Sequence, residues 1–279
     1  MTLGFCAEQV RAHDRDRYLT VLLASADRRE ALFSLYAFNL EVARTREMVS
    51  EPMVGHIRLQ WWREAIDGIY AGTARAHEVV RPLAAAVERY DLTRAYFETL
   101  IDAREFDLGD ESPATEETLQ DYAGDTSSTL MHLALEILGQ RAGGPAHDAA
   151  RYIGVAWGLT GLLRAVVFHA REKRQYLPDD LMRKAGADRA DLFELRAGPA
   201  LATVAEDVAD AARLALFCGR EFRHDVPRAA IPALLPGTLA DMYLRRMARL
   251  GHDLFAQPII IGQPARQFRL LRMTLLGRY

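Results

Sequence analysis

The chain has 279 residues, of which 50% are hydrophobic and 26% are charged, so it can bury a large core within one helical domain. Its formal net charge of −3 argues against the globally basic surface typical of proteins that bind nucleic acid. The two cysteines, Cys6 and Cys218, lack the spacing of a metal site, and a disulfide framework is not expected. This cysteine usage favours a reducing cytoplasm.

The N-terminal segment "MTLGFCAEQVRAHDRDRY" soon becomes charged and has no long apolar stretch. It therefore predicts no secretory signal. Elsewhere in the chain we expect no window with the roughly 20 apolar residues that a membrane-spanning helix needs.

The first half of the chain has a helical pattern, because alanine, leucine, arginine and glutamate dominate and alternating β-branched runs are absent. The stretch "DRREALFSLYAFNLEVARTREMV" predicts one long helix over 27–49, with no residue that would break it before its charged end. Its apolar face is expected to consist of Ala31, Leu35, Phe38 and Val42. Three more helices are expected at about 54–72, 76–90 and 93–108.

The second half continues the same pattern after the loop "GDESPAT". Thr115, followed by Glu116 and Glu117, is a suitable helix start. The helix expected at about 148–171 is nearly uncharged from 153 to 163, which places it at the centre of a bundle. The whole pattern predicts a single all-α domain over 1–279, with about ten helices. The other helices are expected at about 117–139, 199–224 and 237–256, and in a short basic amphipathic segment from 264.

Six segments occur in a fixed order along the chain: "LYAFNLEVARTRE", "WWREAID", "REFDL", "LQDYAGDTSS", "GLTGLLRAVVFHA" and "REKRQYLP". Each is weak alone, but their order and spacing resemble the squalene/phytoene synthase family from about Arg15 to the C-terminal region. The resemblance implies an all-helical bundle of the isoprenoid synthase type with a central cavity. It also implies an ancestral reaction in which prenyl diphosphates condense and Mg²⁺ neutralises the departing pyrophosphate.

The two acidic motifs of that family are altered here. Magnesium prefers hard oxygen ligands, and carboxylates at i and i+4 on a helix can present them together. The first motif falls on residues 43–47 and the second on 165–169, and the asparagine that commonly precedes the second would be Gly161. Their degenerate positions retain one carboxylate, and we expect neither a catalytic residue nor a bound metal or other cofactor. These positions are Ala43, Arg44, Glu47, Ala165, Phe168 and His169.

Four arginines could give the altered cavity another use, because a guanidinium binds phosphate without a metal. They are Arg44, Arg46, Arg164 and Arg174. Alternatively, Arg44 and Arg46 pair with nearby glutamates at positions 41, 47 or 51. The sequence leaves both alternatives open.

Several matches to the family are expected to be scaffold. Tyr122, Asp107 and the "YLP" at 176–178 occupy family positions, and most such residues should pack or position helices. A working Mg²⁺-dependent prenyltransferase would instead need substitute carboxylates, for which Asp107, Asp121 and Asp125 are candidates. Asp121 and Asp125 are an i, i+4 pair.

The pattern "FNLEVARTRE…SEP…IRLQWWR" resembles the branch of the family that contains assembly factors of respiratory complex I and their bacterial relatives. This resemblance implies a bacterial, catalytically degenerate protein whose partners are proteins such as complex I subunits. Two alternatives are an active prenyltransferase and a protein that binds an isoprenoid or lipid phosphate without turnover. The C-terminal basic helix is expected either to contact an anionic membrane, which would make the protein peripheral at the inner membrane, or to dock with a solvated edge.

Overall fold

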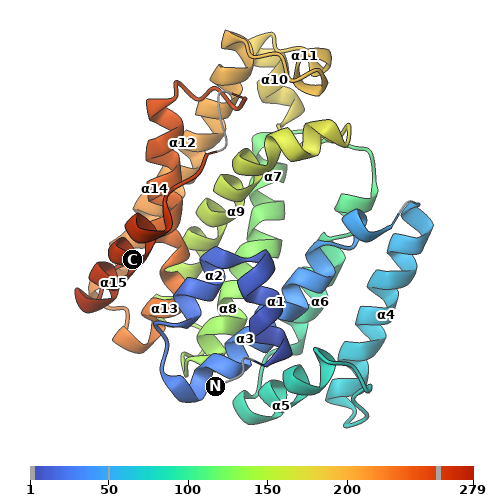
Figure 1. The fold of residues 1–279 in the computed structure, drawn as a ribbon, viewed down its shortest axis with the longest axis vertical. Helices are drawn as coiled ribbons and strands as arrows, with labels where there is room; N and C mark the ends of the chain where they lie inside the picture. Colours follow the sequence, from blue (N-terminus) through green and yellow to red (C-terminus); the bar gives the residue numbers. More distant parts are fainter. Residues whose placement is uncertain (1–3, 50, 256–258) are drawn as a thin grey trace.

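The computed structural model describes residues 4–49, 51–255 and 259–279, and these contain helices but no β-strand. The expectation of an all-α fold is therefore confirmed (Figure 1). The α-helices are α1 (Phe5–His13), α2 (Arg15–Val21), α3 (Ala26–Ala43), α4 (Pro52–Tyr70), α5 (Val80–Tyr90), α6 (Arg94–Ala103), α7 (Glu116–Ala123), α8 (Thr129–Ile137), α9 (Pro145–Arg171), α10 (Asp179–Ala185), α11 (Arg189–Phe193), α12 (Pro199–Glu221), α13 (Ile231–Leu234), α14 (Pro236–Arg249) and α15 (Gln263–Leu275).

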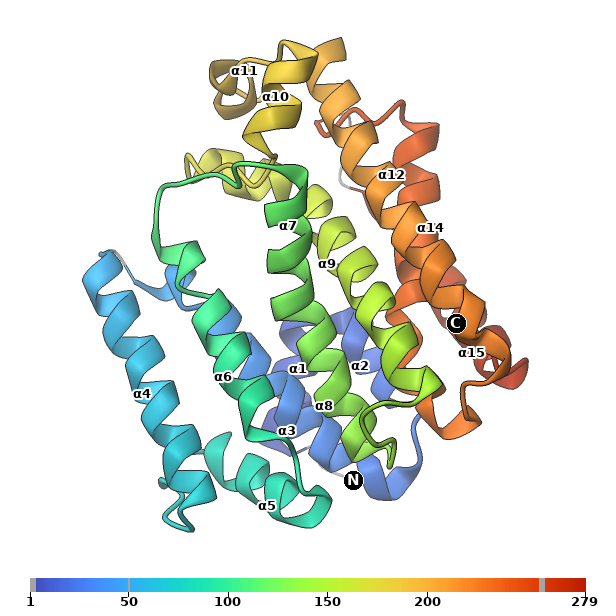
Figure 2. The ribbon, with the colours of Figure 1, turned by 180° about the vertical axis from the view of Figure 1, so that it is seen from behind.

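Helix α9 forms the centre of the bundle, as its uncharged sequence predicts. It packs against α12 and α14 on one side and against α7 and α8 on the other (Figures 1 and 2). Its most apolar 18-residue window has a mean hydropathy of 1.5, so by length and composition it could cross a membrane. The expectation that no window reaches this level is wrong, but the neighbours on both sides make α9 the core helix of a bundle.

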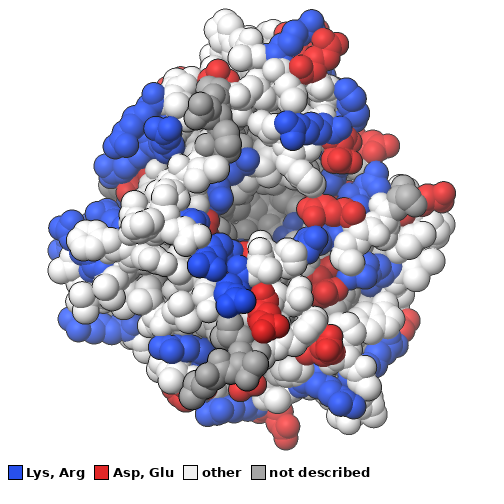
Figure 3. Space-filling model, in the orientation of Figure 1, with Lys and Arg blue, Asp and Glu red and all other residues white. Residues whose placement is uncertain are grey.

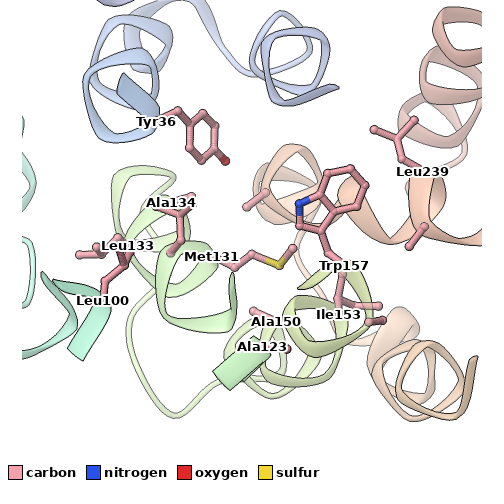
Figure 4. Packing of buried hydrophobic residues seen from close by; sticks show 14 of the residues in the cluster. Tyr36, Leu100, Ala123, Met131, Leu133, Ala134, Ala150, Ile153, Trp157 and Leu239 are labelled. Carbon is pink, nitrogen blue, oxygen red and sulfur yellow. The ribbon is translucent and has the colours of Figure 1, made fainter. Parts of the chain in front are cut away.

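The core around α9 is filled by side chains from several helices (Figure 4). Met131 of α8 points toward Trp157 of α9, and Leu239 of α14 lies on the far side of the indole. Trp157 is only 7% exposed and Met131 4%. Large apolar side chains buried in this way provide most of the stabilisation of a helical domain, about 1.5–3 kcal/mol each.

The first long helix ends earlier than the sequence suggests. Helix α3 stops at Ala43 and a short 3₁₀ helix, η1, follows at Arg46–Met48. The backbone N–H of Thr45 donates to the carbonyl of Val42 at 3.2 Å, and its hydroxyl donates to the carbonyl of Glu41 at 3.3 Å. These bonds satisfy carbonyls at the end of the helix and turn the chain toward α4, which stands at the margin of the molecule (Figure 1).

The helix expected over 117–139 is interrupted in its middle. Helix α7 is followed by a π-helix, η3 (Gly124–Ser128), and then by α8. The predicted start is confirmed, because the Thr115 side chain accepts a hydrogen bond from the N–H of Thr118 at 3.2 Å. The π-helix lies against Gly154 of α9, where an added Cβ would approach the Ser128 Cα to 2.3 Å. Glycine is therefore required here by the close approach of two backbones.

Candidate functional site

The two altered motifs meet at one pocket, as the resemblance implies. The pocket has a volume of about 490 Å³ and lies between the end of α3 and the end of α9. Its lining comprises Arg44, Arg46, Glu47, Val49, Phe168, Glu172 and Arg174. Five of these seven side chains are charged. Figure 3 shows a hollow near the centre of one face of the molecule, with basic and acidic side chains around its rim.

The first wall of the pocket is dominated by arginines. Arg44 forms an ion pair with Glu47 at 3.3 Å, which confirms one of the pairings considered from the sequence. Glu41 is instead held by Arg58 of α4. The Nε atom of Arg46 is buried and has no hydrogen-bond partner among the described residues. The one carboxylate left in this motif is thus engaged, while the Arg46 side chain lines the pocket.

The second motif supplies no carboxylate, and on its wall only Glu172, just beyond α9, offers one. Phe168 is 47% exposed at the pocket, and Ala165 has only a methyl group. The ring of His169 packs on that of Tyr176, with 4.5 Å between centroids. Burial, with a smaller contribution from Arg174, lowers the pKa of His169 to about 4, so the imidazole is neutral at physiological pH. Together, the two walls do not fit Mg²⁺, because only two carboxylates, Glu47 and Glu172, line the pocket among three arginines, and Glu47 is already paired with Arg44.

Asp107 lies beneath the pocket in a buried polar cluster. Its carboxylate accepts hydrogen bonds from the hydroxyls of Tyr122 and Tyr176, both at 2.6 Å, and from Arg104 at 3.2 Å. Arg174 donates to the Asp107 carbonyl at 2.7 Å. Burial raises the pKa of both tyrosines, so they remain hydroxyl donors. The cluster joins separate segments of the chain, which agrees with the expected positioning role, and it leaves Asp107 unavailable as a substitute metal ligand.

Arg164 is not part of the pocket, contrary to the suggested four-arginine site. Its guanidinium stacks over the ring of Tyr243 at 3.7 Å and donates to Asp16 at 3.3 Å. The buried Asp16 also accepts from the Tyr243 hydroxyl at 2.8 Å and from Arg266. Arg164 therefore helps to join α2, α9, α14 and α15. Sequence reasoning missed Asp16, because its partners are as many as 250 positions away.

Asp121 and Asp125 line a different pocket, of about 500 Å³, between α7, η3, α9 and α12. Both are exposed, and the pKa of Asp125 is raised by partial burial and by the neighbouring Asp121. The structure thus does not bring these carboxylates to the pocket of Arg44 and Phe168. Within the described residues there is no group of three or more His, Cys, Asp and Glu side chains that could hold a metal ion.

Comparison with known proteins gives a consistent result. The family model described as squalene/phytoene synthase matches residues 10–273. The "NADH dehydrogenase (ubiquinone) complex I, assembly factor 6" of Bos taurus is 35% identical over 251 residues, which cover 90% of this chain and 75% of the relative. The Homo sapiens protein of that name is 34% identical, and the alignment again covers 90% of this chain and 75% of the relative. Phytoene synthase 1, chloroplastic, of Arabidopsis thaliana is 28% identical and covers 67% of this chain and 46% of that protein.

Solved structures show the same fold. Squalene synthase HpnC from Alicyclobacillus acidocaldarius superposes with a TM-score of 0.78 at 21% identity, covering 88% of this chain and 93% of that one. A dehydrosqualene synthase in complex with ligand gives a TM-score of 0.85 at 18% identity, covering 98% and 94%. These likenesses confirm the expected isoprenoid synthase fold. The assembly factors named above are from eukaryotes, so they do not support the bacterial origin expected from the sequence.

Proposed function

The chain belongs to the squalene/phytoene synthase family, and we propose that it is a catalytically degenerate member that assists the assembly of respiratory complex I. The proposal combines the altered pocket with the names of the relatives. Its partners would be complex I subunits. Its place would be a reducing compartment, at the surface of the inner membrane that holds that complex.

The pocket walls carry the first part of this proposal. A departing pyrophosphate needs divalent cations, and these need several oxygen ligands. The pocket instead has Arg44 and Arg46 on one wall and Phe168 on the other. Of its two carboxylates, Glu47 is paired with Arg44 and Glu172 stands without a second ligand beside it. Positive guanidinium groups at this position repel a metal ion, so metal-assisted ionisation of a prenyl diphosphate is not supported.

An activity assay tests the loss of catalysis. Purified protein is incubated with farnesyl or geranylgeranyl diphosphate and Mg²⁺, alongside a working squalene synthase and a heat-denatured sample of this chain. We expect pyrophosphate release no greater than in the denatured sample. Release well above that level and abolished by EDTA would show that the chain is an active prenyltransferase.

Deletion of the gene in its host tests the assembly role. We expect less assembled complex I on native gels and recovery when the wild-type gene is returned. The E47Q variant is informative, because it removes the last carboxylate of the first motif from a half-exposed position. If the protein acts without catalysis, E47Q should restore assembled complex I in the deletion strain as fully as the wild-type gene does. Unchanged complex I after deletion would refute the assembly role, and failure of a folded E47Q protein would point back to catalysis.

A second candidate function is metal-free binding of a small anion in the same pocket. The lining favours it, because three arginines, Arg44, Arg46 and Arg174, face the same space. Only Val49 and Phe168 supply apolar lining, and Trp157 is packed in the core. These features favour a phosphate-sized group over a long isoprenoid chain.

Calorimetry with pyrophosphate in EDTA tests this second function. We expect binding that the R46Q substitution weakens about ten-fold, the size of one charge-assisted hydrogen bond. R94Q, at an exposed arginine of α6, is the matched control and should bind like wild type. Absence of binding by the wild-type protein would remove this candidate.

A further inference from the structure

The C-terminal helix α15 is fixed to the body of the protein along one face. Leu270 is 1% exposed, and Arg266 pairs with the buried Asp16. After the helix, the Tyr279 ring is buried and its hydroxyl donates to the carbonyl of Gly219 at 2.9 Å. These contacts fix which face of the helix points outward.

The outward face of α15 is apolar rather than solvated. Phe268 is 70% exposed, Leu271 49% and Leu275 69%, and Leu276 just beyond the helix is 51% exposed. Residues 268, 271 and 275 share one helix face because they are three and four positions apart. A docked terminal helix with a solvated edge would have polar side chains here, so this face is built to be covered.

The same segment is strongly basic. Residues 254–279 contain no aspartate or glutamate. Arg269, Arg272 and Arg278 form no ion pair within the described part of the chain, whereas Arg266 does. In projection along the helix, Arg272 lies beside Phe268, and Arg269 lies farther round on the same side. Arg269 and Arg272 therefore border the exposed apolar face without an acidic partner, and Arg278 follows just beyond the helix.

We propose that α15 is a membrane-binding surface that lies flat on an anionic lipid bilayer. Phe268, Leu271 and Leu275 would enter the boundary between headgroups and acyl chains, while the arginines would contact lipid phosphates. A second copy of the chain is a poorer occupant, because a symmetric contact would place six arginines together with no acidic side chain from residues 254–279 to balance them. This inference rests on α15 alone and does not depend on the proposed assembly role.

Vesicle co-sedimentation tests the surface directly. The full-length protein is mixed with vesicles of phosphatidylcholine alone or of phosphatidylcholine with phosphatidylglycerol. We expect binding to the anionic vesicles that weakens as salt is added, because salt screens the arginines. R272Q should reduce partitioning about five-fold, the loss for one basic residue near an anionic surface. F268E should reduce it at least ten-fold, whereas F268W should bind like wild type because tryptophan suits the interface.

The matched control uses exposed apolar residues at the opposite margin of the molecule. Met53 and Ile57 of α4 are 67% and 63% exposed, and α4 and α15 lie on opposite sides in both ribbon views (Figures 1 and 2). M53Q/I57Q should therefore bind vesicles like wild type. The proposal is overturned if the wild-type protein does not co-sediment with anionic vesicles, or if M53Q/I57Q loses as much binding as F268E. It is also overturned if wild type is a dimer in sedimentation velocity and F268E is a monomer, because the face would then be a self-association interface.

Discussion

Replacing Gly154 by alanine tests the close contact between α9 and the π-helix. The new methyl group would lie 2.3 Å from the Cα and 2.5 Å from the N of Ser128. Backbone atoms cannot rotate away as a side chain can, so the cost should reach the upper end of the range for overpacking, about 3 kcal/mol. Alanine returns about 1 kcal/mol through its greater helix propensity. We expect a net destabilisation of about 2 kcal/mol.

Gly161, two turns along the same helix, provides the matched control. A Cβ there meets no atom within 4 Å, so G161A should stabilise the protein by about 1 kcal/mol. An unfolding entropy of about 2.1 cal/mol/K per residue gives a melting temperature about 3–4 °C lower for G154A and about 2 °C higher for G161A. Thermal and urea unfolding measure both. If G154A melts at or above the wild-type temperature, the tight backbone contact is not real.

Three further predictions concern the polar clusters. Because burial lowers the folded-state pKa of His169 from 6.5 to about 4, the unfolded chain takes up the proton first as pH falls. Between pH 6.5 and about 4 the wild-type protein should therefore lose about 2–3 kcal/mol of stability that H169N does not lose, as urea titrations at several pH values would show. D107N should lower the free energy of unfolding by about 3 kcal/mol, because it leaves the buried Arg104 without its negative partner; an unchanged urea midpoint would contradict this. R266M should lower the free energy of unfolding by about 2 kcal/mol, because Asp16 then keeps only its hydrogen bonds from Arg164 and Tyr243. A loss below about 0.5 kcal/mol would mean that the Arg266–Asp16 ion pair contributes no more than an exposed one.

Much of the fold could be predicted because helical periodicity is a local property. The capped start at Thr115, the apolar central helix and the order of the family segments are all visible in the sequence. Helix ends were harder to predict. Helix α3 ends at Ala43 although residues 44–47 are acceptable in a helix, because the Thr45 side chain and the turn toward α4 satisfy its last carbonyls.

Spacing along the chain was enough to bring residues of both motifs to one pocket, whereas the direction of a helix face could not be predicted from the sequence. Arg44, Arg46 and Glu47 of the first motif meet Phe168 of the second at one pocket. Arg164 is one turn from Phe168 on α9, yet its side chain reaches Tyr243 and Asp16 instead. Asp121 and Asp125 share a face, but only the packing of α7 and η3 against α9 determines that this face lines another pocket. Which pocket a helix face lines depends on contacts between segments that are distant in the sequence.

The position of His169 makes the loss of the acidic motif hard to reverse. A carboxylate restored there would face Tyr176, whose hydroxyl already serves Asp107, and would add a second negative charge beside a buried one. Restoring acids on the other wall first would place them among Arg44 and Arg46. Neither single change would therefore assemble a metal site, because Asp107 disfavours the first carboxylate and arginines would pair with the others.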